Sequence, residues 1–213
     1  MPTPIQLTYL YDPLCGWCYG AAPAIKTLMQ YDDITVTAQP SGLFAGPGAF
    51  AMSAGFAAHA WAADQRIGQL TGQEFSAAYR ENLLERTTGM VDSGPATLAV
   101  SAVHLTAPEQ EFDALLAMQR ARYVEGRDNG DATVIATVLR ESGLDAAAER
   151  FADPDAALLS FNDDRIQAAQ AEMRRFGARG VPTLILGTGP EARVVDTNAL
   201  YGRPEALIGA LRA

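Results

Sequence analysis

The most informative stretch of the sequence is Asp12-Pro13-Leu14-Cys15-Gly16-Trp17-Cys18-Tyr19. It contains both of the cysteines in the 213 residues, separated by two residues. Apolar side chains alternate over residues 5–11, which predicts a strand that ends at Asp12-Pro13. Apolar residues then recur at helical spacing from Cys15 to about residue 30, which predicts a helix. The cysteine pair is therefore expected where a strand passes into a helix.

This position gives the two cysteines different expected roles. Two intervening residues place both sulfur atoms over the first helical turn, so a disulfide can form and open with little backbone movement. The sulfur of Cys15 lies over the unpaired N–H groups of the helix N-terminus, whose partial positive charge favours a thiolate. The thiolate is the attacking species in thiol–disulfide exchange, and Cys18, one turn further in, should be more shielded. We therefore predict that Cys15 attacks and Cys18 resolves.

Three other interpretations of the cysteine pair are a structural disulfide, half of a zinc site and chance spacing. A structural disulfide is disfavoured because its loop would be too short to constrain the unfolded chain, and a reducing compartment would open it. Half of a zinc site needs two more ligands, and the remaining candidates, His59 and His104, lie in separate helical segments. Chance spacing of two buried cysteines rarely falls at a strand-to-helix junction. A redox-active pair without a metal is the preferred interpretation.

The rest of the chain is organised around this first unit. Residues 34–38 alternate as a second strand, so the chain begins with a β-α-β unit of the size of a right-handed crossover. Between residues 46 and 176 no strand is predicted, and the pattern indicates six or seven helices, the last from about Asp163. Strands are predicted again at residues 181–186 and 192–196, and a helix at 204–211. This order, β-α-β, helices, then β-β-α, predicts an α/β fold.

Composition and charge exclude several classes of partner. Sixteen Lys and Arg residues against 25 Asp and Glu give a net charge of −9, and Lys26 is the one lysine. Clustered positive charge is missing, which argues against nucleic acid or an anionic membrane as a partner. No apolar run approaches the roughly 18 residues of a membrane-spanning helix. Residues 1–14 lack the basic start and apolar core of a secretory signal, so a cytoplasmic location is expected.

A second element of interest is Gly180-Val181-Pro182-Thr183, at the start of the third predicted strand. A proline can open a strand without removing a hydrogen bond from the sheet. About 5–6% of X–Pro bonds in folded proteins are cis, so the proline alone does not identify a functional site. The residues by themselves leave the role of this segment open.

Taken together, these features resemble the DsbA family of the thioredoxin superfamily. The stretch at residues 12–19 is similar to the D-P-x-C-x-W-C-Y signature of its cytoplasmic FrnE-like branch. The resemblance implies a thioredoxin-like domain formed by residues 1–45 and 177–213, interrupted by an all-helical insertion of residues 46–176. It also implies that Pro182 is cis and lies close to the cysteines. Val181 would then offer its backbone N–H and C=O to an extended substrate.

The sequence departs from the periplasmic members of that family, which carry Pro-His between the cysteines. Gly16-Trp17 supplies neither the ring charge of that histidine nor the stiffness of that proline, so the strong oxidising power of the periplasmic members is not expected. Trp17 is either an apolar platform for substrate or a packed aromatic residue. Asp12 is either a proton acceptor near Cys15 or simply the end of a strand. Tyr19 and the loop at residues 41–43 are further candidates for lining the site.

Three functions remain in view. The preferred one is a disulfide reductase or isomerase that acts on protein or peptide disulfides through a mixed disulfide on Cys15. It needs no bound cofactor, and glutathione or a thioredoxin system would supply its electrons. A glutathione-dependent transferase or isomerase, of the kappa or hydroxychromene-carboxylate isomerase type, would use a serine at the helix N-terminus. A non-catalytic cytoplasmic adaptor is the third. Having both Cys15 and Cys18 favours the first.

Overall fold

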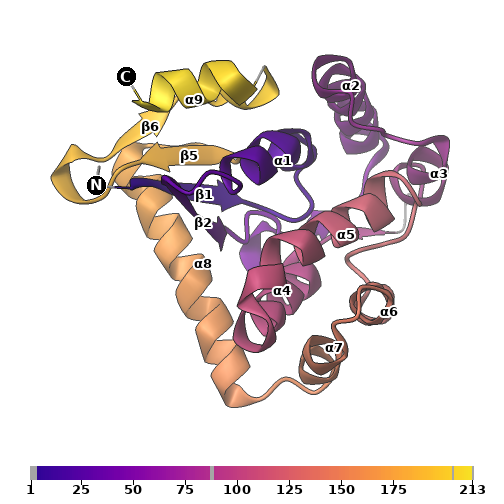
Figure 1. The fold of residues 1–213 in the computed structure, drawn as a ribbon. Helices are drawn as coiled ribbons and strands as arrows, with labels where there is room; N and C mark the ends of the chain where they lie inside the picture. Colours follow the sequence, from indigo (N-terminus) through magenta and orange to yellow (C-terminus); the bar gives the residue numbers. More distant parts are fainter. Residues whose placement is uncertain (1–3, 87–88, 203, 213) are drawn as a thin grey trace.

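The fold is built on a four-stranded mixed sheet (Figure 1). The computed structural model describes residues 4–86, 89–202 and 204–212. The strand order is β2-β1-β5-β6, with β1 parallel to β2 and the other neighbouring pairs antiparallel. The strands are β1 (Ile5–Tyr11), β2 (Ile34–Pro40), β5 (Thr183–Leu186) and β6 (Arg193–Val195). Helix α1 (Gly16–Leu28) joins β1 to β2, and α9 (Pro204–Arg212) follows β6. The predicted α/β fold with β-α-β and β-β-α halves is confirmed.

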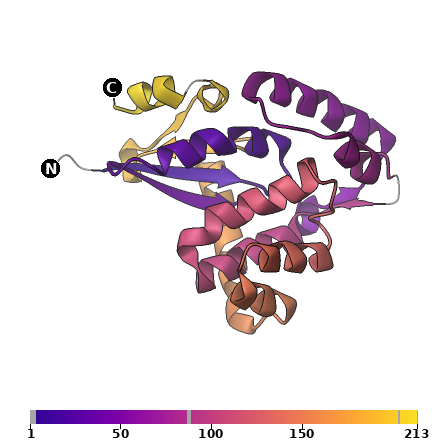
Figure 2. The same cartoon turned by 45° about the vertical axis from the view of Figure 1, so that its right-hand side comes forward.

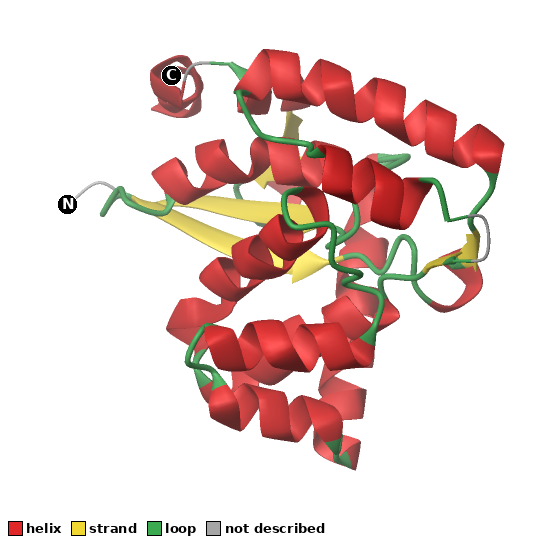
Figure 3. Cartoon of the chain, turned by 90° about the vertical axis from the view of Figure 1, so that its right-hand side faces the viewer, coloured by secondary structure: helices red, strands yellow, loops and turns green. Residues whose placement is uncertain are grey.

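Both faces of the sheet are covered by helices, as Figure 3 shows. Successive side chains of a strand point to opposite faces, so β1 contributes to two clusters. Tyr9 packs in the large cluster that contains the apolar face of α1. Leu10 packs on the other face with Ile185 and with Ala169 of helix α8 (Ala156–Phe176). The result is a three-layer arrangement that holds β1 rigid on both sides, directly before the cysteine pair.

Seven α-helices lie between β2 and β5 in the described ranges, in agreement with the predicted six or seven. Helix α2 runs beside α1 (Figure 2). Helix α3 continues directly into a π-helical turn over Arg80–Leu84, and short 3-10 turns occur at Gly46–Gly48, Pro108–Gln110, Gly189–Glu191 and Thr197–Tyr201. The helices besides α8 are α2 (Ala54–Thr71), α3 (Ala77–Tyr79), α4 (Gly94–Thr106), α5 (Glu111–Tyr123), α6 (Ala132–Glu141) and α7 (Asp145–Ala152).

Two predictions for this segment were wrong in detail. The insertion is not entirely helical, because β3 (Phe50–Ala51) pairs antiparallel with β4 (Met90–Val91). Strands of two residues are too short to show an alternating pattern, so hydrophobic periodicity could not identify them. Helix α8 begins at Ala156 instead of near Asp163, because the Asp155 carboxylate caps it by accepting a hydrogen bond from the backbone N–H of Leu158.

The predicted core and the predicted insertion share one hydrophobic cluster. Leu7 of β1 and Ile25 of α1 belong to the same group of buried residues as Val100 of α4 and Ile135 of α6. The division into residues 1–45 plus 177–213 and 46–176 stays a prediction. What the packing establishes is that the helices after β2 are held firmly against the sheet and α1.

None of the helices in the described ranges has the length and hydropathy of a membrane-spanning helix. Within the same ranges, no group of three or more His, Cys, Asp and Glu side chains is placed to hold a metal ion.

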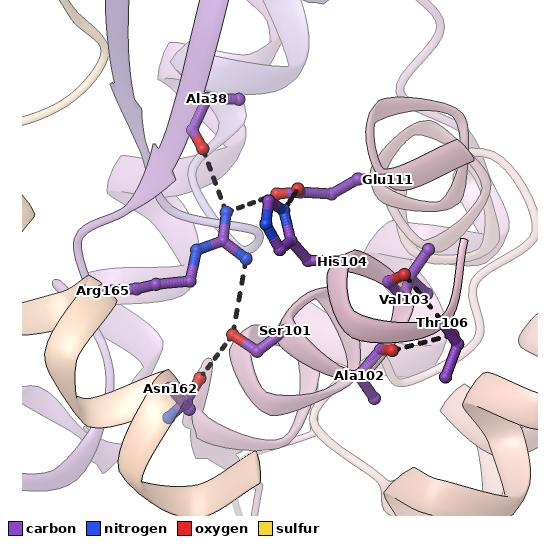
Figure 4. Close-up of polar contacts among 9 residues, drawn as sticks. All are labelled: Ala38, Ser101, Ala102, Val103, His104, Thr106, Glu111, Asn162 and Arg165. Atoms are coloured by element: carbon purple, nitrogen blue, oxygen red, sulfur yellow. Dashed lines mark hydrogen bonds and ion pairs between the residues drawn. The ribbon is translucent and has the colours of Figure 1, made fainter. Parts of the chain in front are cut away.

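A buried ionic network attaches α8 to the sheet and to α5 (Figure 4). The Arg165 guanidinium donates hydrogen bonds to the Glu111 carboxylate and to the carbonyl oxygen of Ala38 on β2, the latter at 3.0 Å. The side chains of Arg165 and Glu111 are 10% and 11% exposed. His104 Nδ1 contacts the second Glu111 oxygen, so this histidine has a partner in the fold, far from the cysteines in sequence. The network therefore fixes α8, the helix that precedes β5 in the chain.

Candidate active site

Cys15 is the N-cap of helix α1, which agrees with the predicted start of a helix near Cys15. The backbone N–H of Cys18 donates a hydrogen bond to Cys15 Sγ over 3.3 Å. Both residues are free thiols, with Cys15 7% exposed and Cys18 fully buried. The first sulfur is therefore held at the helix N-terminus, among N–H groups that stabilise negative charge.

Burial raises the pKa of the Cys18 thiol well above its usual range, and hydrogen bonding and charge from Cys15 raise it further. A thiol with a raised pKa stays protonated, and Cys18 is also the more deeply buried of the two sulfurs. The environment of the two sulfurs thus differs in the direction that an attacking and a resolving cysteine require.

The Val181–Pro182 peptide bond is cis and lies beside the cysteine pair. Cys15 Sγ donates a hydrogen bond to the carbonyl oxygen of Val181, with 3.4 Å between the two atoms. Pro182 is buried and Val181 is partly exposed. The fold therefore brings together the two sequence elements singled out above, although 166 positions separate Cys15 from Val181.

Asp12 is fully buried, and its carboxylate holds three segments together. Its oxygens accept hydrogen bonds from the backbone N–H of Leu14 at 2.9 Å, the backbone N–H of Phe44 at 3.1 Å and the Ser93 hydroxyl at 2.7 Å. Burial raises the pKa of Asp12, and these donors pull that pKa partly back down. Because both oxygens are engaged, the geometry favours the structural role at the end of β1 over the role of proton acceptor.

The two aromatic residues beside the cysteines have different surroundings. Trp17 is half-buried and contacts Tyr201 edge-on, with 5.1 Å between ring centroids. Tyr19 is buried and points into the core, where it stacks on Tyr123 of α5 at 4.8 Å. The Tyr123 hydroxyl donates a hydrogen bond to the carbonyl oxygen of Leu14 at 2.8 Å. Trp17 remains available at the site, whereas Tyr19 supports it from behind.

Helices after β2 contribute site residues that the sequence did not reveal. A cavity of about 170 Å³ adjoins Cys15 and Trp17, and its wall includes His59, Asp64, Tyr79, Arg122 and Tyr123. Asp64 and Arg122 are both buried. Charged side chains are rarely buried without a partner, so a charged residue on the apolar face of a helix is the one sequence signal that indicates such a site.

Gly16, between the two cysteines, is required by the close approach of α2. A Cβ atom at this position would collide with Asp64 Oδ1 and would also contact the Ile67 side chain at 3.5 Å. The glycine therefore lets the helix carrying Asp64 pack directly against the first residue of α1.

The loop at residues 41–43 borders a different and larger cavity. This cavity has a volume of about 640 Å³ and lies between that loop and the C-terminal end of α8. Its wall includes Ser41, Leu43, Met173 and Arg174, but neither cysteine. Phe44, the next residue of the loop, reaches the cavity beside Cys15.

Comparison with known proteins identifies relatives of this arrangement. A family model for the DSBA-like thioredoxin domain matches residues 6–202. The chain is similar to the cytosolic disulfide reductase DsbM from Pseudomonas aeruginosa, at 34% identity over 97% of this chain and 98% of that chain, with a TM-score of 0.84. The structure of DsbM with GSH has a TM-score of 0.83, with 34% identity over 98% of this chain and all of that chain.

More distant similarities indicate the fold alone. A 2-hydroxychromene-2-carboxylate isomerase has a TM-score of 0.61 and 17% identity, over 97% of this chain and 96% of that chain. A comparison with curated protein sequences gave no match.

Proposed function

Because the chain belongs to the DSBA-like thioredoxin domain family, we propose that it is a cytoplasmic disulfide reductase that acts through Cys15 and Cys18. One observation carries the proposal: the Cys15 thiol caps helix α1 and lies 3.4 Å from the Val181 carbonyl, with Cys18 buried directly behind it. The 34% identity to a protein named as a cytosolic disulfide reductase supports the location and the direction of the reaction.

The first half of the proposed reaction forms a mixed disulfide. Cys15 loses its proton, and its sulfur attacks one sulfur of the substrate disulfide. A bond forms between Cys15 and that sulfur, the substrate S–S bond breaks, and the other substrate sulfur leaves as a thiolate that takes up a proton. The Val181 backbone, beside Cys15, would pair with an extended peptide on either side of the substrate sulfur.

The second half releases the substrate. The Cys18 sulfur loses its proton and attacks Cys15, so the Cys15–Cys18 disulfide forms and the second substrate thiol leaves. The substrate has gained two electrons and two protons, which the pair has lost. Two glutathione molecules, becoming glutathione disulfide, or the dithiol of a thioredoxin system would restore the pair. The DsbM structure with GSH supports glutathione as the donor.

Turnover with a peptide disulfide and reduced glutathione tests this proposal. We expect the protein to accelerate peptide reduction well beyond the rate with glutathione alone, and to accelerate the oxidation of a peptide dithiol far less. A protein that promotes oxidation alone would contradict the proposed direction. Turnover of a small electrophile with glutathione that survives Cys18→Ser would indicate a glutathione transferase or isomerase. No acceleration in any of these assays would leave the adaptor function.

A further inference from the structure

The cavity beside Cys15 contains a buried carboxyl group that the reaction above does not use. Asp64 lies on α2, is 4% exposed and shares the cavity wall with Cys15. Its Oδ2 atom accepts a hydrogen bond from the Tyr79 hydroxyl at 2.9 Å. Its Oδ1 atom points at Gly16, the residue that follows Cys15, and occupies the space that a Cβ atom there would need. The carboxyl group is therefore fixed against the first turn of the helix that carries the cysteine pair.

The surroundings of Asp64 allow it to change its protonation near neutral pH. Burial raises its pKa to about 7, while the Tyr79 hydrogen bond and the charge of Arg122 act in the opposite direction. The groups that face it are Tyr79 of α3, Arg122 and Tyr123 of α5, Cys15, and His59 from its own helix. Arg122 is already engaged, with Asn129 at 3.3 Å and Asp128 at 3.7 Å, so it does not neutralise Asp64 as a closed ion pair.

The other buried aspartate near the pair is in a different position. Asp12 holds three hydrogen bonds from the chain through its two oxygens, as described above. Within the described ranges the hydrogen-bond donor to Asp64 is Tyr79, and its second oxygen faces Gly16 and the cavity. Of the two carboxyl groups, Asp64 is the one with an oxygen free to exchange a proton.

We propose that Asp64 exchanges protons with the cysteine pair during disulfide reduction. This inference rests on the proposed reductase function and assigns it a residue on α2. As Cys15 attacks, its proton passes to the Asp64 carboxylate, and the resulting acid returns that proton to the substrate sulfur that leaves as a thiolate. No proton is gained or lost overall, and the substrate disulfide is the oxidant. Both residues line the cavity of about 170 Å³, which has room for water to carry the proton, since one water occupies roughly 30 Å³.

The variant Asp64→Asn tests this, because it keeps an oxygen for the Tyr79 hydroxyl and removes the titrating group. Pre-reduced protein is mixed with a peptide disulfide in a single turnover between pH 5.5 and 9. We expect the wild-type rate to change with an inflection near pH 7, and Asp64→Asn to lose that inflection and react about ten- to a hundredfold more slowly at pH 7.5. Asp113→Asn, at an exposed residue paired with Lys26, is the matched control and should behave as wild type.

Alkylation of Cys15 by iodoacetamide separates proton exchange from a structural effect. The leaving iodide needs no proton, and removing a nearby negative charge favours the thiolate. Asp64→Asn should therefore alkylate at the wild-type rate or faster while it reduces the disulfide more slowly. Tyr79→Phe is a second variant that keeps the carboxyl group. Because loss of the hydrogen bond raises the pKa of Asp64, the inflection should move to higher pH.

The stability of Asp64→Asn provides an independent check that the carboxyl group titrates. A carboxyl whose folded pKa is raised from 3.8 to about 7 destabilises the fold as the pH rises through that window. The Tm of Asp64→Asn should therefore match that of wild type near pH 4 and exceed it by a few degrees at pH 8.

Each result has a definite meaning. A wild-type pH profile and rate in Asp64→Asn, or equal slowing of alkylation and reduction, would overturn the role of Asp64 while the reductase function stands. A wild-type protein that reduces no disulfide would overturn the proposed function instead. If Asp64→Asn does not fold, an unmoved inflection in Tyr79→Phe overturns the inference.

Discussion

Replacing Cys15 with serine is expected to lower disulfide reduction by at least about a thousandfold, to the background rate. A serine hydroxyl at the N-cap of α1 can still accept the hydrogen bond that Cys15 Sγ accepts from Cys18, so the helix should keep its start. What is lost is the sulfur nucleophile, and removal of a nucleophile commonly costs several orders of magnitude in rate. The measurement is peptide-disulfide turnover with glutathione.

The companion variant Cys18→Ser should stop the same reaction at a later stage. Cys15 can still attack, but no second thiol remains to release the substrate, so a mixed disulfide accumulates. Because the chain has two cysteines, the adduct in this variant has one possible site. Intact-mass measurement after mixing with a peptide disulfide should show close to one adduct per chain. We expect Cys15→Ser to form far less, because Cys18 is fully buried and its thiol has a raised pKa.

Retention of a tenth or more of the activity by Cys15→Ser would contradict the assigned roles. Faster adduct formation in Cys15→Ser, which retains Cys18, than in Cys18→Ser, which retains Cys15, would also contradict them. Equal Tm values for wild type and both variants, measured under reducing conditions, serve as the control for folding.

Replacing Arg165 with methionine should destabilise the protein by about 3–5 kcal/mol, the cost of removing one partner of a buried ion pair. The substitution leaves the Glu111 carboxylate buried beside His104 and removes the hydrogen bond to Ala38 at the edge of the sheet (Figure 4). For a chain of this length, each kcal/mol corresponds to roughly 2–4 °C in Tm. Urea unfolding followed by circular dichroism gives the free energy directly.

Two further variants make this prediction specific. Arg175→Met removes an exposed pair with Glu172 and should cost at most about 1 kcal/mol. The double variant Arg165→Met with Glu111→Leu replaces both buried charges and should recover at least half of the loss. A loss below about 1 kcal/mol for Arg165→Met, or no recovery in the double variant, would show that the network does not hold α8 as described.

The parts of the fold that depend on local pattern could be predicted from the sequence. The alternation over residues 5–11, the turn at Asp12-Pro13 and the helical spacing after Cys15 each identify their own element, and the cysteine pair lies between them. The two-residue strands β3 and β4 could not be found, because their pairing is set by tertiary contacts. The start of α8 was misplaced because its cap, Asp155, lies well before the apolar residues that define its packed face.

The candidate site likewise has residues that the sequence predicted and residues that only the structure revealed. Cys15 and Cys18 were predicted from their spacing at a strand-to-helix junction, and the Val181–Pro182 segment from the resemblance to the DsbA family. The fold places these residues together. Asp64, Tyr79 and Arg122 come from separate helices, and their meeting beside Gly16 depends on how α2 and α5 pack. A sequence pattern gives the face of a helix but not its neighbour, so this part of the site required the structure.

The reduction potential of the Cys15–Cys18 pair tests the central claim most directly. Purified protein is equilibrated in glutathione buffers of defined ratio, and the fraction oxidised is followed by tryptophan fluorescence, since Trp17 lies between the cysteines. We predict a value in the reducing range, near the roughly −270 mV of thioredoxin, so that the pair rests as a dithiol in a reducing compartment. A value near the roughly −120 mV of DsbA would make the pair a strong oxidant and contradict the assignment as a reductase.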